Sequence, residues 1–314
     1  MTEDSRKLQP IDLATLAYLG VATLALARVL AAEPPSRWGW LVVAHGLLGA
    51  LVFLAPRARE AGPVGRFVGD WYPMLLLGAL YGEIGVLTLA NGVSYDAAIQ
   101  RLETLVFGSQ VSYRWIRETP DPTLSWTLHL SYLSYYPVLY ASPLVLWLGG
   151  RRDAARHTVL AVMVTFYVCY VVSLFFPVAG PRYAFPLPDN AATAVWPARA
   201  AQWLLDHGDS WGVAFPSSHV AASVVATGMA LRHVRRLGLV LLPFTTGLVL
   251  AVVYGQFHYG VDALAGLALA AGTLAMLWGR GTAAARDGAP AGSVMAVLLP
   301  GGRGRGASGG IAAP

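Results

Sequence analysis

The chain has 314 residues, of which 56% are hydrophobic and only 12% are charged, and its mean hydropathy is +0.54. Soluble domains carry about 25% charged residues, so this composition excludes an ordinary soluble protein. The apolar residues come in blocks of membrane-spanning length, which predicts an all-α integral membrane protein. The net charge of +5 comes from arginines in the connections between these blocks, so it indicates membrane topology and no nucleic-acid partner.

About eight apolar segments are long enough to cross a membrane as helices. We place them at residues 11–30, 38–55, 71–90, 124–149, 157–177, 217–231, 237–257 and 259–279. The first two spans and their cytoplasmic connections make up residues 1–70, and the other six form a membrane domain over residues 71–279. The Gly-, Ala- and Arg-rich residues 280–314 have little to bury, which predicts a disordered cytoplasmic tail.

Two segments of the membrane domain are too polar to span. In residues 94–117, Ser94 can cap a helix, and Ile99, Leu102 and Leu105 recur at helical spacing. We therefore expect a helix that lies in the membrane interface there. Residues 178–216 predict a long loop that carries a short surface helix over about residues 197–207.

The basic residues predict the orientation of the spans. With the N-terminus in the cytoplasm, most of them lie on the cytoplasmic side: Arg6, Lys7, Arg57, Arg59, Arg66, Arg151, Arg152, Arg156, Arg232, Arg235, Arg236 and those of the tail. Fewer then lie outside, namely Arg37, Arg101, Arg114, Arg117, Arg182 and Arg199. The positive-inside rule thus favours a multi-pass protein of the cell (inner) membrane, with both termini cytoplasmic and the 178–216 loop extracytoplasmic.

Two histidines begin predicted spans on this outer face. His258 and Asp262 are four residues apart at a helix start, so the carboxylate can accept a hydrogen bond from one ring nitrogen and make the other more nucleophilic. His219 follows Ser217 and Ser218 at the start of the sixth span. The free N–H groups of a helix start, with two hydroxyls beside them, predict a phosphate-binding site.

Arg182, in the preceding loop on the same face, could bind the remaining phosphate oxygens. Together these residues predict phosphoryl transfer without a metal or other cofactor, in which one histidine attacks phosphorus and the second protonates the leaving oxygen. No span carries the aspartate cluster that a magnesium enzyme needs. A zinc site from His219, His258 and Asp262 is conceivable, but the serine-rich helix start suits an oxyanion better.

The segments Ala214-Phe-Pro-Ser-Ser-His219 and His258-Tyr-Gly-Val-Asp262 resemble the second and third signature motifs of the type 2 phosphatidic acid phosphatase superfamily. The resemblance covers residues 71–279 and implies the family's six-helix core, to which the first two spans are additions. It also implies that His258 is a nucleophile that forms a phosphohistidine, that Asp262 orients it and that His219 is the general acid. Ser217 and Ser218 would then belong to the phosphate site.

The chain departs from the phosphatases of this superfamily at two places. Ala251-Val252 stands where their third motif has Ser-Arg, and Gly180-Pro-Arg-Tyr183 stands where their first motif ends. This pattern is closer to the inositol phosphorylceramide synthase branch, which transfers a phosphoryl headgroup to a lipid hydroxyl. We therefore expect a lipid phosphotransferase acting on lipid phosphate or phospholipid headgroups in the bilayer. The alternatives are a lipid-phosphate phosphatase that transfers to water and, last, a non-enzymatic transporter, for which paired midplane Gly/Pro interruptions are lacking.

Four further polar residues are candidates for a substrate pocket. Glu83 lies near the middle of the third span, where a charge costs about 3 kcal/mol or more, so it either serves the site or is protonated and hydrogen-bonded to a neighbouring helix. His129, Tyr132 and Tyr136 lie in the outer half of the fourth span and could line a headgroup pocket. An aromatic belt at the interface explains the tyrosines equally well.

Overall fold

The computed structural model describes residues 7–32 and 35–278, so the predicted tail lies outside the described residues. Within these ranges the regular secondary structure is helical, apart from one isolated parallel bridge between Val178 and Val213. The helices are α1 (Pro10–Ala32), α2 (Pro35–Glu60), α3 (Gly62–Leu75), α4 (Leu77–Asn91), α5 (Asp96–Phe107), α6 (Val111–Glu118), α7 (Pro122–Leu133), α8 (Tyr135–Leu148), α9 (Arg152–Phe175), α10 (Pro181–Ala184), α11 (Trp196–Gly208), α12 (Ser218–His233), α13 (Arg235–Tyr254) and α14 (Gly260–Trp278).

Six helical segments in the described ranges are long and apolar enough to cross a membrane. They are Pro10–Ala32, Gly39–Glu60, Gly62–Asn91, Arg152–Phe175, Arg235–Tyr254 and Gly260–Trp278. The all-helical membrane class is thus confirmed. The other two predicted spans, 124–149 and 217–231, correspond to the pair α7–α8 and to the 16-residue α12, so the count of eight stays a prediction.

The predicted fourth span is divided at Ser134, between α7 and α8. Pro137 explains the break, because proline has no N–H to bond the carbonyl of Leu133 four residues earlier. A proline also affects α3, where Pro73 frees the carbonyl of Gly69. That carbonyl instead accepts a hydrogen bond of 3.1 Å from Arg59 Nε.

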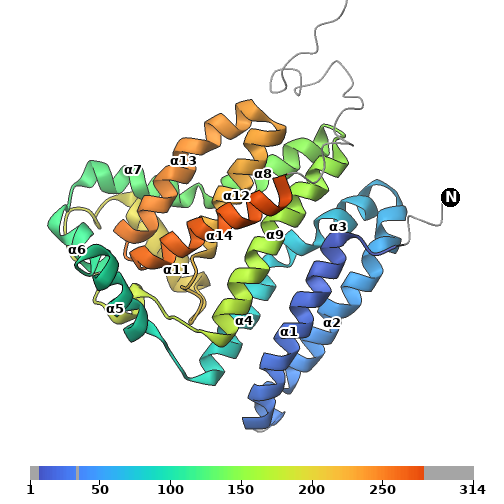
Figure 1. Cartoon of the computed structure of the whole chain (residues 1–314), viewed down its shortest axis with the longest axis horizontal. Helices are drawn as coiled ribbons and strands as arrows, with labels where there is room; N and C mark the ends of the chain where they lie inside the picture. The colour runs from blue at the N-terminus through green and yellow to red at the C-terminus, as the bar shows by residue number, and fades with distance from the viewer. Residues whose placement is uncertain (1–6, 33–34, 279–314) are drawn as a thin grey trace, which may run out of the picture.

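The helix α12 lies at the centre of the bundle and packs against α8, α9, α13 and α14 (Figure 1). Its contacts use small side chains, and Ala221, Ala222 and Ala226 are completely buried. In α14, a Cβ atom at Gly266 would come within 2.7 Å of the Ser217 carbonyl oxygen. The absence of a side chain at Gly266 therefore allows the start of α12 to lie directly against the first turns of α14.

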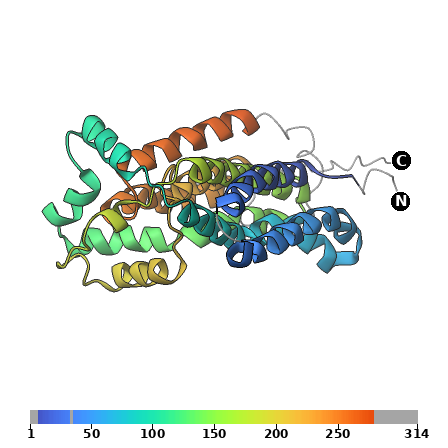
Figure 2. The same ribbon diagram turned by 90° about the horizontal axis from the view of Figure 1, so that it is seen from below.

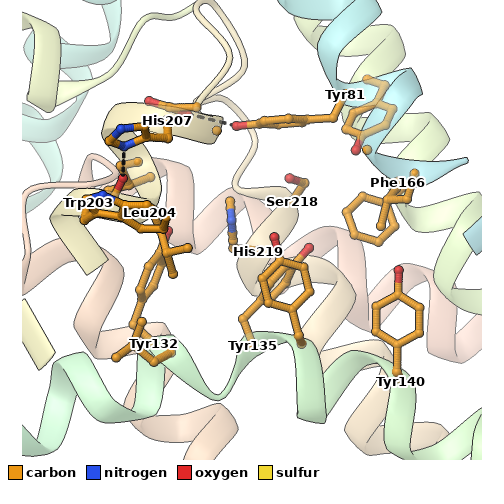
Figure 3. Close-up of a pocket in the computed structure, with 18 residues that line it drawn as sticks. Tyr81, Tyr132, Tyr135, Tyr140, Phe166, Trp203, Leu204, His207, Ser218 and His219 are labelled. Atoms are coloured by element: carbon orange, nitrogen blue, oxygen red, sulfur yellow. Dashed lines mark hydrogen bonds between the residues drawn. The ribbon is translucent and has the colours of Figure 1, made fainter. Parts of the chain in front are cut away.

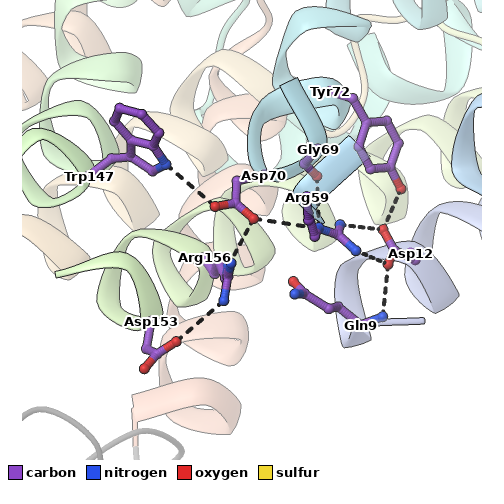
Figure 4. A network of polar contacts seen from close by, with 9 residues as sticks. All are labelled: Gln9, Asp12, Arg59, Gly69, Asp70, Tyr72, Trp147, Asp153 and Arg156. Atoms are coloured by element: carbon purple, nitrogen blue, oxygen red, sulfur yellow. Dashed lines mark hydrogen bonds and ion pairs between the residues drawn. The ribbon is translucent and has the colours of Figure 1, made fainter. Parts of the chain in front are cut away.

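A buried network of charged side chains joins the N-terminal helices to the rest of the bundle (Figure 4). The Arg59 guanidinium of α2 donates hydrogen bonds of 2.7 and 2.8 Å to the completely buried Asp12 of α1. Arg59 Nε also lies 3.5 Å from Asp70 of α3, which accepts a hydrogen bond of 2.8 Å from Arg156 of α9. The network is therefore continuous across residue 70, the predicted domain boundary.

The end of the bundle away from α1 and α2 carries the short helices α5, α6 and α11 (Figures 1 and 2). The segment predicted as one interfacial helix over residues 94–117 is two helices, α5 and α6. Gly108 ends α5 with φ at 72°, a left-handed conformation that favours glycine. The surface helix expected near residues 197–207 is confirmed as α11.

Candidate active site

Two segments far apart in the sequence bring the histidines to the same end of the bundle. Val178 and Val213 pair in the parallel bridge, and the Ala214 amide donates a hydrogen bond of 2.9 Å to the Val178 carbonyl. The Ala214 carbonyl then accepts a hydrogen bond of 2.9 Å from His258 Nδ1. The ring centroid of His219, the second residue of α12, lies 5.7 Å from that of His258. Both imidazoles therefore border the same small volume.

The hydrogen bond at Nδ1 selects the tautomer of the neutral His258 ring. In the neutral ring, Nδ1–H donates to the Ala214 carbonyl, so Nε2 carries the lone pair and can act as a nucleophile. The predicted hydrogen bond from His258 Nδ1 to Asp262 is not formed, because Asp262 Oδ2 lies 3.6 Å from Nδ1, beyond hydrogen-bond distance. Asp262 instead accepts a hydrogen bond of 2.8 Å from the Tyr259 amide at the start of its own helix. The backbone of Ala214 therefore orients the ring, and Asp262 is a completely buried carboxyl group beside it.

The two serines before His219 have different surroundings. Ser217 is completely buried and caps α12, because its Oγ accepts a hydrogen bond of 3.3 Å from the Val220 amide. Ser218 borders open space beside His219. His219 itself is half-buried, and its Nδ1 has no hydrogen-bond partner among the residues that the structure describes. Of the two serines predicted to bind phosphate, only Ser218 thus lines one of the spaces beside His219.

Arg182 reaches the histidines from α10. Its Nη2 donates a hydrogen bond to Asp206 of α11, and its Nε lies 3.8 Å from Asp209 Oδ2. Its Nη1 is buried and has no partner within the described part of the chain. An anion bound beside the histidines could take this free donor.

Two adjoining spaces border these side chains. The smaller, termed the histidine recess, is lined by Arg182, Asp209, His219 and His258 among others. The larger, termed the tyrosine cavity, has a volume of about 480 Å³, and six tyrosines line it: Tyr81, Tyr132, Tyr135, Tyr136, Tyr140 and Tyr170. Figure 3 shows His219 between Tyr132 and Tyr135, and its ring centroid lies 5.8 and 4.6 Å from theirs. His219 therefore belongs to the walls of both spaces.

A family model described as the PAP2 superfamily matches residues 97–276, more than half of the chain, and the match includes both histidine motifs. The chain belongs to the PAP2 superfamily. Comparison with curated proteins gives no match, and comparison with solved structures gives none either. Membership of this superfamily, together with the apolar helices, supports a membrane enzyme of the phosphatase type. The inositol phosphorylceramide synthase-like branch stays a prediction.

In this PAP2 protein, the two residues that stand in place of Ser-Arg are aliphatic and buried. Ala251 and Val252 lie in the last turn of α13, where they are 1% and 0% exposed. The Val252 carbonyl accepts hydrogen bonds of 2.8 Å from the His258 amide and 2.9 Å from the Phe257 amide. These positions shape the backbone before His258 but supply no side-chain donor to a phosphate.

The PAP2 chain brings two of the four predicted pocket residues to the site. Tyr132 and Tyr136 line the tyrosine cavity. Glu83 Oε1 shares a hydrogen bond of 2.8 Å with Nδ1 of His45 in α2, and Glu83 lines neither the recess nor the cavity. His129 contacts the Ser125 carbonyl at 2.8 Å and lines a separate space. Across the described residues, no group of three or more His, Cys, Asp or Glu side chains could hold a metal ion.

Two acidic residues of α5 support the site and were not predicted from the sequence. The first, Asp96, accepts hydrogen bonds of 2.8 Å from the amides of Ala179 and Gly180, just before Arg182. It also accepts a hydrogen bond of 2.9 Å from the hydroxyl of Tyr259, the residue after His258. Asp96 thus connects the arginine loop to the histidine loop.

The second, Glu103, is completely buried. Its carboxylate accepts hydrogen bonds of 3.1 and 3.0 Å from the amide and hydroxyl of Ser112, and one of 2.9 Å from the Gly260 amide at the start of α14. Burial raises the pKa of the Glu103 carboxyl above its ordinary value, although these hydrogen bonds oppose the shift. The sequence contained a signal that Glu103 is buried, since it lies four residues after Ile99 on the apolar stripe of α5.

Proposed function

We propose that the protein is a membrane-embedded lipid phosphotransferase that moves a phosphoryl headgroup from a phospholipid to a hydroxyl group. The observation that carries the proposal is that His219, His258 and Arg182 line one recess, with the Nδ1 of His258 already bonded to a carbonyl. A neutral imidazole nucleophile, a second imidazole and a guanidinium are the groups that metal-independent phosphoryl transfer requires.

In the proposed first step, His258 Nε2 attacks phosphorus and the bond from phosphorus to the lipid oxygen breaks. His219, in its protonated form, gives its proton to the leaving alkoxide, so a phosphohistidine and a free lipid alcohol result. In the second step, His219 takes the proton of an acceptor hydroxyl, whose oxygen attacks phosphorus and breaks the P–N bond. Arg182 and Ser218 donate hydrogen bonds to the non-bridging oxygens in both steps.

Two features favour an alcohol over water as the acceptor. The tyrosine cavity of about 480 Å³ adjoins His219, which leaves room for an acceptor beside the proton-transferring ring. The buried Ala251 and Val252 also leave the recess with fewer cationic donors than the phosphatase motif implies. Hydrolysis by the same phosphohistidine route is the second candidate, because water needs only His219 as its base.

We further propose eight spans, with α7–α8 and α12 as the two that complete the six apolar segments, in the cell (inner) membrane. Both histidines then lie at the extracytoplasmic face, as the arginine distribution predicts. Impermeant maleimide tests this orientation in a Cys169→Ser background, since Cys169 is the sole cysteine. Ser94→Cys should react in intact cells and Arg57→Cys only after permeabilisation; the reverse pattern would overturn the topology.

The function is tested with phospholipid labelled in its headgroup phosphate, incubated with purified protein with and without a lipid alcohol. We expect label to pass to the alcohol, vanadate to inhibit, and His258→Ala to lose at least about a thousandfold in rate. His157→Asn is the control, because His157 packs against His233 at the other end of the bundle. Full activity of His258→Ala would disprove the nucleophile, and label passing only to water would favour the phosphatase. A protein that moves lipid across vesicles without an acid-labile phosphoenzyme would be the transporter.

A further inference from the structure

Asp209 is a carboxylate held at the junction of the histidine recess and the tyrosine cavity, since it lines both. Its Oδ1 accepts hydrogen bonds of 2.9 Å from the hydroxyl of Tyr81 in α4 and from the Ser210 amide. Its Oδ2 accepts a hydrogen bond of 3.2 Å from the Tyr183 hydroxyl and lies 3.8 Å from Arg182 Nε. Four groups from three segments thus fix a carboxylate beside the phosphate-binding guanidinium.

The histidine recess has few cationic side chains for a site proposed to bind phosphate. Among the described side chains that line it, Arg182 carries the one permanent positive charge. Asp206 forms a second ion pair with Arg182, and the guanidinium holds the pKa of Asp206 below its usual value, so Asp206 is ionised at neutral pH. Asp262 lies behind His258. The single guanidinium is therefore already matched by carboxylates before any substrate binds.

The remaining groups that face Asp209 add no permanent positive charge. Tyr81 approaches from α4, Tyr183 from the end of α10, and Tyr132 of α7 and His219 of α12 line the same recess. The tyrosines are neutral donors at physiological pH. A phosphate bound to the free Nη1 of Arg182 would therefore meet the fixed negative charge of Asp209, and besides Arg182 only the histidines of the recess, when protonated, oppose that charge.

We propose that Asp209 is a selectivity residue that makes the site accept the single negative charge of a phosphodiester and reject the double charge of a phosphomonoester. The inference rests on the proposed function and adds its substrate class, a phospholipid with an esterified headgroup as donor. The physical reason is Coulombic, because a second unit charge a few ångströms from Asp209 is repelled where solvent screening is weak. A phosphodiester has one ionised oxygen, which Arg182 can take.

The test uses two unreactive probes that differ in charge, octylphosphonate and octylsulfonate, in which carbon replaces the bridging oxygen. Titration calorimetry in detergent gives their affinities at about pH 9.5, where the phosphonate has two charges, and at about pH 5.5, where it has one. We expect the wild type to prefer the sulfonate at least about tenfold at the higher pH, and the preference to approach one at the lower pH. Asp209→Asn should reduce the preference at the higher pH at least about fivefold. Glu118→Gln, which removes the same charge from an exposed pair with Arg114, should leave it unchanged.

Equal affinities at the higher pH in the wild type, or an unchanged preference in Asp209→Asn, would overturn the inference. If Asp209→Asn fails to fold, the pH dependence of the wild-type preference decides alone, since the sulfonate corrects for titration of the histidines. Turnover is measured separately. A protein with the expected preference but no transfer or hydrolysis would refute the proposed function only, and an active protein without the preference would refute the selectivity only.

Discussion

Replacement of Glu103 by alanine tests whether α5 holds the histidine loop in position. The change removes three hydrogen bonds from a completely buried carboxylate and leaves the Ser112 and Gly260 amides without their acceptor. An unsatisfied buried amide costs about 1–3 kcal/mol, so two of them predict a loss of about 2–6 kcal/mol in the free energy of unfolding. Because Gly260 comes two residues after His258, we also expect phosphoryl transfer to fall at least about tenfold.

Thermal unfolding in detergent, followed by tryptophan fluorescence, gives the stability, and the labelled-phospholipid assay gives the rate. Glu103→Gln keeps a carbonyl oxygen for both amides, so it should stay within about 1 kcal/mol of the wild type. Glu118→Ala is the matched control on the neighbouring helix α6, where an exposed pair with Arg114 contributes at most about 1 kcal/mol. If Glu103→Ala melts and reacts like the wild type, the contact between α5 and α14 does not position His258.

Three further predictions follow from the pKa of Glu103, the close approach at Gly266 and the ion pair of Arg59. The raised pKa of Glu103 means that the wild type loses stability as pH rises through that pKa, whereas Glu103→Gln should lack this part of the pH dependence of its melting temperature. Gly266→Ala places a Cβ against the Ser217 carbonyl oxygen and should lower the free energy of unfolding by about 1–3 kcal/mol. Gly272→Ala in the same helix meets nothing within 4 Å and should be neutral or slightly stabilising. Equal melting temperatures of the two variants would contradict the close approach of α14 to the start of α12. Arg59→Gln leaves the buried Asp12 carboxylate without its ion-pair partner and should lower the free energy of unfolding by about 3–5 kcal/mol. The same change at the exposed Arg57 should cost less than about 1 kcal/mol. Similar losses in both variants would rule out the ion pair.

The helical class and the two histidine motifs could be predicted because both depend on local rules. The membrane sets the length of an apolar helix, and a histidine at the start of such a helix is visible in the sequence itself. The length rule failed to show that residues 124–149 form two helices, because hydropathy averages over Pro137. The proline was the available signal, since it removes one backbone hydrogen bond inside the segment.

The partners of the site residues could not be predicted, because they come from distant segments. The spacing of His258 and Asp262 predicts a shared helix face, but α14 begins only at Gly260, so His258 lies before the helix. Its ring is therefore free to bond the carbonyl of Ala214, and no sequence pattern identifies that oxygen. The partner of Glu83 could not be predicted either. The sequence left open whether Glu83 serves the substrate site or bonds a neighbouring helix, and its partner, His45, lies in a different span.

Asp12 and Arg59 both belong to the helical hairpin α1–α2, which is synthesised before α9. Their ion pair is complete within that hairpin, before Arg156 of α9 exists to pair with Asp70. The hairpin can thus enter the bilayer with its buried aspartate already paired, while Asp70, which lies 3.5 Å from Arg59, gains its hydrogen bond from Arg156 only when α9 arrives. The order of synthesis therefore allows α1 and α2 to pair before α9 packs against α1 and α3, where Arg156 completes the network at Asp70.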